Sequence, residues 1–352
     1  MSESRLRRRE EARASRLRRR RAGAGLGLVV VLAVVIALAA GGGKGGSTAR
    51  TGSAAVKGKR TAAAGAPGRV SVSVAQTGRL PAAVQDAAAV AISNQSFLML
   101  GGIDQSEAST ADVVSATASG ASRIGSLPTA LHDASASFVD GAAYVFGGGA
   151  VSSFSSITRV DAAGGAQPAG QLPAPASDVA SVTVEGAVYV VGGYTGQAPL
   201  RTILAWRPGG QARVAGMLPK PLRYAAVAST GGQIVIAGGT SGEAASRDVY
   251  RFDSHTGRVT PIGLLPSPVT HAAAVALGGT VFVFGGRDAS STSQTARILA
   301  ISASGAVRAA GALPQPLSDL AAVALGGHIV VAGGRDRNGR LHDAILTMTL
   351  NH

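Results

Sequence analysis

The sequence predicts an all-β fold, a propeller of six four-stranded blades, from two repeated motifs that stay in phase. An apolar run closed by two glycines occurs six times, with its first glycines 46, 45, 46, 47 and 48 residues apart. A Gly-x-Leu-Pro motif also occurs six times, once before each of these runs. A fixed period of this length indicates repeated supersecondary units, and four-stranded propeller blades fall in this range. The double-glycine runs are FLMLGG (97–102), AYVFGG (143–148), VYVVGG (188–193), IVIAGG (234–239), VFVFGG (281–286) and IVVAGG (329–334).

The order of features within one repeat predicts the four strands of a blade. An apolar stretch after each Leu-Pro, such as AAAVAI at 87–92, is separated from the double-glycine run by a turn pair such as Asp140-Gly141. Two apolar runs joined in this way indicate a β-hairpin. A polar loop then leads to a third strand, clearest in TILAW (202–206) and DVYRFD (248–253). A short fourth strand such as RVTPIG (258–263) runs to the next Leu-Pro.

The two ends of the repeat region are incomplete in complementary ways. VSVSVAQT at 70–77 has the place of a fourth strand without the first three. AILTMTL at 344–350 has the place of a third strand without a fourth. We therefore expect the N-terminal strand to complete the sixth blade, which removes an open sheet edge.

This pattern resembles the kelch repeat of the galactose oxidase central-domain-like superfamily, over roughly residues 70–352. The double glycine is present in all six copies. The aromatic residue of the third kelch strand is present as Tyr250, with Trp206 nearby in its own repeat, whereas the fourth-strand tryptophan is absent. Galactose oxidase-like proteins use a tyrosine–cysteine cross-link at a copper site, and a chain without cysteine cannot form it.

The N-terminal region predicts a membrane-anchored bacterial type of this propeller. Residues 22–40 carry no charge, and nineteen residues of helix span roughly 28 Å, close to the ~30 Å hydrocarbon core. The ten arginines of residues 1–21 place that tail in the cytoplasm and the rest of the chain outside. Residues 41–69, rich in Gly, Ala and Ser, are expected to form a flexible linker. The alternative is a signal peptide cleaved at Ala37-Leu38-Ala39, which would release a secreted protein.

Composition excludes several classes of function. The chain has no cysteine, which rules out a disulfide scaffold, a thiolate metal site and a cysteine nucleophile. Its net charge of +14 lies almost wholly before residue 70, since the propeller region has 17 basic and 16 acidic residues, and nucleic acid is therefore not an expected partner. Arginine outnumbers lysine 29 to 4, a bias typical of a GC-rich bacterial genome.

The long loops between the second and third strands share one face of the predicted propeller, and binding residues concentrate on such loops. The short glycine turns occupy the opposite face. The structural alternative is that the loop residues are solvated without a ligand. The candidate binding residues on this loop face are Asp104, Tyr194, Arg201, Arg223, Arg287, Asp288, Arg335, Asp336 and Arg337.

The fifth residue after each Leu-Pro proline is polar in all six repeats and is expected to ring the mouth of the central channel. Four carboxylates and a histidine suit a hard cation such as calcium. The competing interpretation is structural, a polar side chain that bonds to neighbouring backbone. A third interpretation is that the ring takes part in catalysis. The ring residues are Asp86, Asp133, Asp178, Tyr224, His271 and Asp319.

No catalytic motif stands out, and the six histidines lack metal-ligand spacing. No catalytic residue and no metal ligand is therefore assigned. The sequence predicts a membrane-anchored, extracytoplasmic binding module whose ligand is a protein or an envelope glycan. The alternative comes from the resemblance to sialic-acid mutarotase-like kelch proteins. It implies a carbohydrate-active enzyme with its site at the central pocket, where Arg201, Arg223, Arg287 and Arg335 could meet a carboxylate.

The charge pattern around residues 22–40 gives a topology that can be tested. A reporter fused after residue 352 is expected to be active only outside the cytoplasm, and the protein is expected in the membrane fraction, because the arginines precede the apolar run. Recovery of a soluble form that begins near Ala40 would instead favour the cleaved signal peptide.

Overall fold

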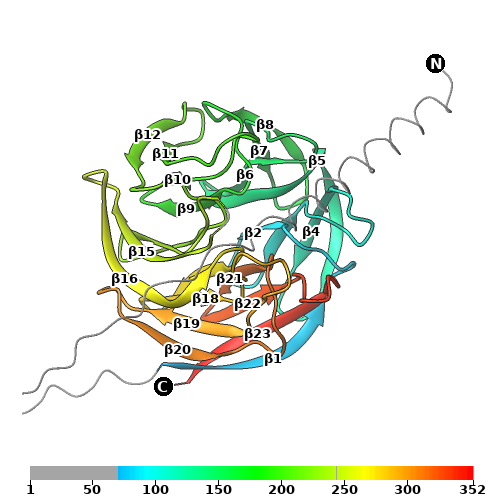
Figure 1. Ribbon diagram of the computed structural model, residues 1–352. Helices are drawn as coiled ribbons and strands as arrows, with labels where there is room; N and C mark the ends of the chain where they lie inside the picture. The colour runs from blue at the N-terminus through cyan, green and yellow to red at the C-terminus, as the bar shows by residue number, and fades with distance from the viewer. Residues whose placement is uncertain (1–69, 243, 352) are drawn as a thin grey trace, which may run out of the picture. The chain divides into compact units, whose positions relative to one another are not determined.

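The computed structural model describes residues 70–242 and 244–351, and all regular structure in these ranges is β-strand. The predicted cytoplasmic tail, membrane anchor and linker at 1–21, 22–40 and 41–69 lie outside the described residues. A search of the described ranges found no helix with the length and apolar character needed to cross a membrane. Figure 1 shows the sheets arranged side by side around a central axis.

The strands form six four-stranded antiparallel blades. Blade 1 contains β2 (Ala88–Ala91), β3 (Phe97–Leu100), β4 (Thr110–Ala116) and the start of β5 (Ala121–Val139); blade 2 contains the end of β5, β6 (Ala142–Gly149), β7 (Ser156–Val160) and β8 (Ala166–Gln171). Blade 3 contains β9 (Ala180–Val184), β10 (Ala187–Val191), β11 (Thr202–Trp206) and β12 (Arg213–Met217). Blade 4 contains β13 (Ala226–Thr230), β14 (Gln233–Ala237), β15 (Ser246–Asp253) and β16 (Arg258–Val269). Blade 5 contains β17 (Ala273–Leu277), β18 (Thr280–Phe284), β19 (Arg297–Ile301) and β20 (Val307–Ala312).

Blade 6 is closed by the N-terminal strand, as the sequence predicts. It contains β21 (Ala321–Leu325), β22 (His328–Ala332), β23 (Ala344–Asn351) and, at its outer edge, β1 (Ser71–Arg79). β1 pairs antiparallel with β23 from Ser71 opposite Asn351 to Arg79 opposite Ala344. Figure 1 shows the blue N-terminal strand beside the red C-terminal one. The pairing therefore joins the two ends of the described chain.

The strands leaving blades 1 and 4 are longer than the sequence suggests. β5 passes from the fourth strand of blade 1 directly into the first strand of blade 2, so the two blades form one seven-stranded sheet. β16 likewise continues past its Leu-Pro to Val269, opposite Ser246. The segment between blades stays extended because its residues pair with the start of the third strand.

The double glycine connects each blade to the next. In every blade the N–H of the second glycine donates to a carbonyl at the start of the next blade, for example Gly148 to Ala176 at 2.9 Å. A Cβ on Gly147, whose φ is +61°, would overlap the same Ala176 oxygen. Only glycine permits this φ and this close approach without strain. The bonds at the other junctions are Gly102 to Leu131, Gly193 to Leu222, Gly239 to Val269, Gly286 to Leu317 and Gly334 to Val84.

The Gly-x-Leu-Pro motif has a packing role in every blade. Its glycine lies at a β-bulge in the fourth strand. Its leucine is buried in each copy, with at most 6% exposure. The leucines are Leu80, Leu127, Leu172, Leu218, Leu265 and Leu313. Apolar clusters lie between neighbouring blades, and between blades 2 and 3 Trp206 packs edge-on against Tyr144 and Phe146.

The pairing of β1 with β23 predicts how truncation affects stability. Deletion of residues 70–77 is expected to lower the Tm by at least about 5 °C, because it exposes β23 and a loss of 2–3 kcal/mol or more has this effect. Deletion of residues 42–69, whose sequence offers little apolar surface for packing, should leave the Tm unchanged. Equal Tm values for the two deletions, measured by calorimetry, would contradict the closure.

Candidate functional site

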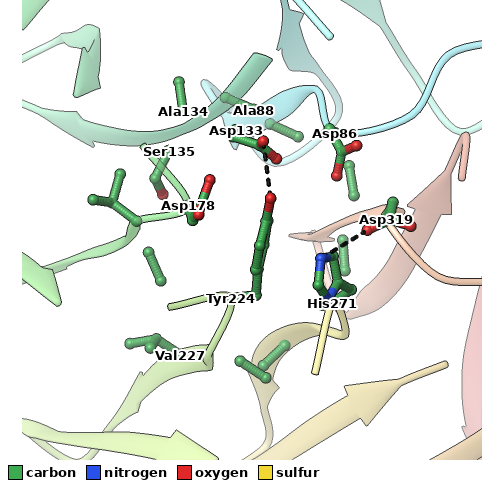
Figure 2. Close-up of a pocket in the computed structure, with 18 of the residues that line it drawn as sticks. Asp86, Ala88, Asp133, Ala134, Ser135, Asp178, Tyr224, Val227, His271 and Asp319 are labelled. Atoms are coloured by element: carbon green, nitrogen blue, oxygen red, sulfur yellow. Dashed lines mark hydrogen bonds and ion pairs between the residues drawn. The ribbon is translucent and has the colours of Figure 1, made fainter. Parts of the chain in front are cut away.

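The six inner strands surround a recess of about 200 Å³ on the propeller axis, and the six ring residues predicted from the sequence all line it. Below the ring the walls are mostly alanine, with Ser135 and Ser181 on one side. Figure 2 shows the ring side chains from different blades converging on this recess. The ring and the long loops share one face, because the residue before each ring position pairs with the residue after each double glycine, as in Ser177 with Tyr194.

The backbone explains why these positions are polar. All six ring residues have positive φ, between 52° and 59°. Asp, Asn and His are enriched several-fold among non-glycine residues in this region. The main-chain N–H of a ring residue donates to the carbonyl of the ring residue in the preceding blade at five of the six junctions, for example Asp178 to Asp133 at 2.7 Å. The bond to the neighbouring blade is therefore made by the main chain, and the side chains are left to face the recess.

Tyr224 is the centre of the contacts inside the ring. Its hydroxyl donates to Asp133 Oδ2 at 3.0 Å. Its ring stacks on the imidazole of His271, with centroids 3.6 Å apart and an interplanar angle of 25°. Burial, and then the negative charges of Asp133 and Asp178, raise the Tyr224 pKa, so the phenol remains a hydrogen-bond donor.

His271 is held as a neutral imidazole. Its Nε2 lies 3.0 Å from Nη2 of Arg287, and since a guanidinium only donates, Nε2 accepts. Nδ1 then carries the proton and donates to Thr270 Oγ1 at 3.1 Å. Burial, followed by the positive charges of Arg287 and Arg223, lowers the pKa of His271 well below its ordinary value. Nε2 also faces Asp319 Oδ1 at 3.9 Å.

The four carboxyl groups of the ring have raised pKa values. Burial is the largest cause for each of them. The pKa of Asp86 is raised further by Asp319 and Asp133, and that of Asp133 by Asp178. Asp178 differs because its ion pair with Arg223 opposes the rise in its pKa. The ring therefore combines carboxyls whose pKa values are shifted toward the protonated form, most strongly at Asp86 and Asp133, with a neutral histidine.

Three arginines surround the ring on the side of blades 4 to 6. Arg223 pairs with Asp178 and lies over the rings of Tyr194 and Tyr224, at 4.3 and 4.8 Å from their centroids. Arg287 contacts His271, as described. The backbone of Arg335 pairs with that of Ser318, next to Asp319, and its Nε is buried without a hydrogen-bond partner.

Three of the predicted binding residues organise their own loops. Asp104, Asp288 and Asp336 each stand two residues after a double glycine. Each accepts backbone N–H groups from residues further along its loop; Asp336 Oδ1, for example, accepts from Asn338 and Arg340 at 2.8 and 3.0 Å. The pKa of Asp104 is lowered mainly by the hydroxyl of Ser106, and that of Asp288 mainly by the hydroxyl of Ser293. For Asp336, burial raises the pKa, but the hydrogen bonds, led by the N–H of Arg340, lower it overall. The recurring Gly-Gly-x-Asp spacing was the sequence signal for this structural role.

Two predicted binding residues lie away from the ring. Arg201 Nε donates to the carbonyl of Leu218 at 3.0 Å, on the outer part of blade 3. Arg337 Nη2 reaches the carbonyl of Gln294 at 3.5 Å. Within the described residues, neither side chain lines the central recess.

The sequence reasoning missed a set of hydroxyl groups on the inner strands of blades 2 and 3. Ser181 Oγ bonds to Ser135 Oγ and Ser137 Oγ, both at 2.9 Å, and Thr183 Oγ1 donates to the carbonyl of Phe138. The alternation of small hydroxyl and apolar residues in SVTV (181–184) was the available signal. Across 70–242 and 244–351 no group of three or more His, Asp or Glu side chains is arranged to hold a metal ion.

Comparison with known proteins agrees with this architecture. The family model of the Kelch motif matches residues 175–211 and 221–263. The solved structure of YjhT superposes with a TM-score of 0.68 at 14% sequence identity, covering 78% of this chain and 99% of YjhT. At this identity the likeness shows the fold alone. A search of curated protein sequences found no match. The findings support a kelch-type β-propeller, a fold that in general serves as a binding or interaction module.

The raised carboxyl pKa values predict a pH-dependent stability. A raised folded-state pKa stabilises the protein below the unfolded value of about 3.9, and this contribution is lost as pH rises through the folded value. The double variant Asp86→Asn/Asp133→Asn does not lose stability in this way, because asparagine has no carboxyl group to titrate at these two positions. Asparagine also tolerates the positive φ. Its free energy of unfolding relative to the parent should therefore rise between about pH 4 and pH 7, by roughly 1.4 kcal/mol for each pKa unit.

Denaturant unfolding of both proteins across this pH range measures the difference. The lowered pKa values of His132 and His271 act in the opposite direction in both proteins and cancel in the comparison. Asp140→Asn is the matched control, since Asp140 has a φ of 50° in an exposed turn of the opposite face. A difference that stays flat with pH for the double variant would contradict the raised values.

Proposed function

We propose that the protein is a membrane-anchored, extracytoplasmic binding module that uses its loop face to bind a glycan of the cell envelope. The observation that carries this proposal is the ring recess, which gathers buried hydrogen-bonding groups of both kinds in one place. Carboxyls with raised pKa values and a phenol donate there, carboxyl oxygens accept, and arginines lie beside the ring. Ligand sites place such polar groups to fix the orientation of a polar ligand. Sugar hydroxyls donate and accept, and they suit this mixture.

The distribution of apolar surface favours a glycan over a protein partner. Four large apolar side chains are strongly exposed among the described residues. Val214, Met217 and Leu264 belong to or follow fourth strands at the outside of the blades, and Val151 alone lies in a loop of the ring face. Protein interfaces have an apolar core, and large exposed apolar patches mark them. A protein partner remains the second candidate, through the polar loops.

The location rests on the sequence. The uncharged residues 22–40 follow ten arginines, which is the pattern of an uncleaved anchor with its N-terminus in the cytoplasm. The propeller would then meet envelope glycans outside the cell. Cleavage after residue 39 would give a secreted protein with the same binding face.

A carbohydrate-active enzyme is a further candidate, favoured by one feature of the ring. Neutral His271 and the protonated carboxyls of Asp86 and Asp133 are a base and two acids around one recess. Groups with perturbed pKa values in a recess are candidates for proton transfer. Incubating envelope sugars with the purified protein and following their structure by NMR would separate turnover from binding.

The arginines beside the ring give the test of the working face. Arg287→Ala and Arg335→Ala are each expected to weaken glycan binding by about 2 kcal/mol, since a central arginine commonly has this effect when truncated. Binding is measured as retention of an envelope glycan fraction on the immobilised full chain, with retained proteins and sugars analysed separately. Asp140→Asn, on the opposite face, should bind like the parent. Loss of binding in Asp140→Asn with both arginine variants unaffected would reverse the assignment of the face.

A further inference from the structure

The charges of the ring are divided unevenly between the blades. On one side, Asp178 forms an ion pair with Arg223, and His271 contacts Arg287. The positive charges of Arg287 and Arg335 also act on the Asp319 carboxyl and lower its pKa against the effect of burial. On the other side, Asp86 and Asp133 form no ion pair with any Lys or Arg of the described chain. Buried carboxyl groups without a positive partner are costly in their charged form. The recess therefore has no Lys or Arg partner beside blades 1 and 2, where His132 Nε2 lies 3.5 Å from Asp133 Oδ2.

A second observation concerns a proton shared by two carboxyl groups at the same place. The side chain of Asp319 is only 8% exposed, and its Oδ1 has no N–H or hydroxyl partner, so the donor left to this carboxyl is the neighbouring carboxyl of Asp86, with which it shares a hydrogen bond. Oδ2 of the same carboxyl is bonded to Ser318 Oγ at 2.6 Å. Figure 2 shows Asp319 on the wall of the recess, between Asp86 and His271. An ammonium group that enters the recess can donate to Asp319 in place of the carboxyl proton of Asp86.

The arrangement of the carboxyls favours an organic cation over a metal ion. Asp86, Asp133 and Asp319 extend from blades 1, 2 and 6, and they interact around the ring as neighbours rather than as ligands of one point. The described residues offer no three-ligand metal group. An ammonium carries three donors, and hydroxyl groups attached to the same molecule supply more. The recess, at about 200 Å³, is smaller than the roughly 300–1,000 Å³ of drug-sized sites and suits one small unit.

We propose that the ring binds the ammonium group of an unacetylated amino sugar, with Asp86, Asp133 and Asp319 as its acceptors. This inference rests on the proposed function and names the ligand class for the same site. Tyr224 and the arginines of blades 4 to 6 then face the hydroxyl groups of the sugar. An N-acetylated sugar lacks the positive charge, so the ring selects against it.

Protons take part in this binding. The raised pKa values of Asp86 and Asp133 favour the protonated form in the free protein, and these carboxyls lose protons when a cation arrives, because an opposite charge favours the ionised carboxyl. The other titratable or charged groups at the ring are Asp178, Asp319, Tyr224, His132, His271, Arg223, Arg287 and Arg335. The arginines keep their charge, so the carboxyls are the groups that release protons.

Calorimetric titration of the purified full chain with three matched probes tests the proposal. Glucosamine is expected to bind at least tenfold more tightly than N-acetylglucosamine or glucose, and its affinity should increase from about pH 5 to about pH 7, above the ordinary Asp range near 3.9. The binding enthalpy should depend on the buffer, because protons are released. Asp86→Asn should reduce glucosamine affinity at least tenfold, while Asp140→Asn, the same change at a similar φ on the opposite face, should not.

The outcomes separate this inference from the proposed function. Equal binding of all three sugars would overturn the ammonium proposal and leave glycan binding intact. Binding of ethanolamine as tight as that of glucosamine would support the cation site and contradict the sugar. A calcium titration that saturates the protein and displaces glucosamine would assign the ring to a metal ion, contrary to the proposal. Unchanged glucosamine affinity in a folded Asp86→Asn variant, with its Tm as the check on folding, would also overturn it.

Discussion

The structure depends on a single hydrogen bond repeated around the axis, from the second glycine of each pair to the first carbonyls of the next blade. All six junctions contain it, including the one that joins blade 6 to blade 1. It requires two consecutive residues with positive φ and no Cβ, which is why the glycines recur through the sequence with so little variation. Apolar clusters pack between the same blades that this bond joins.

The same junctions also give the ring its chemistry. Two residues beyond each accepting carbonyl, the chain turns through positive φ, and the ring residue bonds to its neighbour through its main chain. A short acidic side chain tolerates that conformation, so the backbone favours aspartate at these positions. Burial around the axis then raises the pKa values of all four carboxyls, and the neighbouring carboxyls raise those of Asp86 and Asp133 further. A site with unusual proton affinity thus follows from the geometry of closure.

Most of the fold could be predicted from the sequence, but only part of the site. Periodicity fixed the six blades, and the complementary ends at 70–77 and 344–350 predicted the closure that β1 and β23 form. The regular spacing also identified the ring. It could not show which side chains meet across the axis, because Tyr224 and Asp133 are 91 residues apart and meet only once three blades are assembled. The spacing also could not distinguish the roles of two adjacent residues. Asp288 accepts a hydrogen bond from its own loop, whereas Arg287 contacts His271 of the ring.

The closing strand has a consequence for how the protein is made. β1 is synthesised before any other strand of the propeller, yet its partner β23 follows at the very end, with Thr77 and Thr347 separated by 270 residues. Such distant contacts slow folding, because loop closure must precede the pairing that compensates for it. A ribosome that stalls, or a protease that cuts before residue 344, leaves an unpaired strand at each end of the nascent molecule. Exposed edges of this kind recruit other chains, so a propeller that lacks β23, residues 344–351, is expected to aggregate.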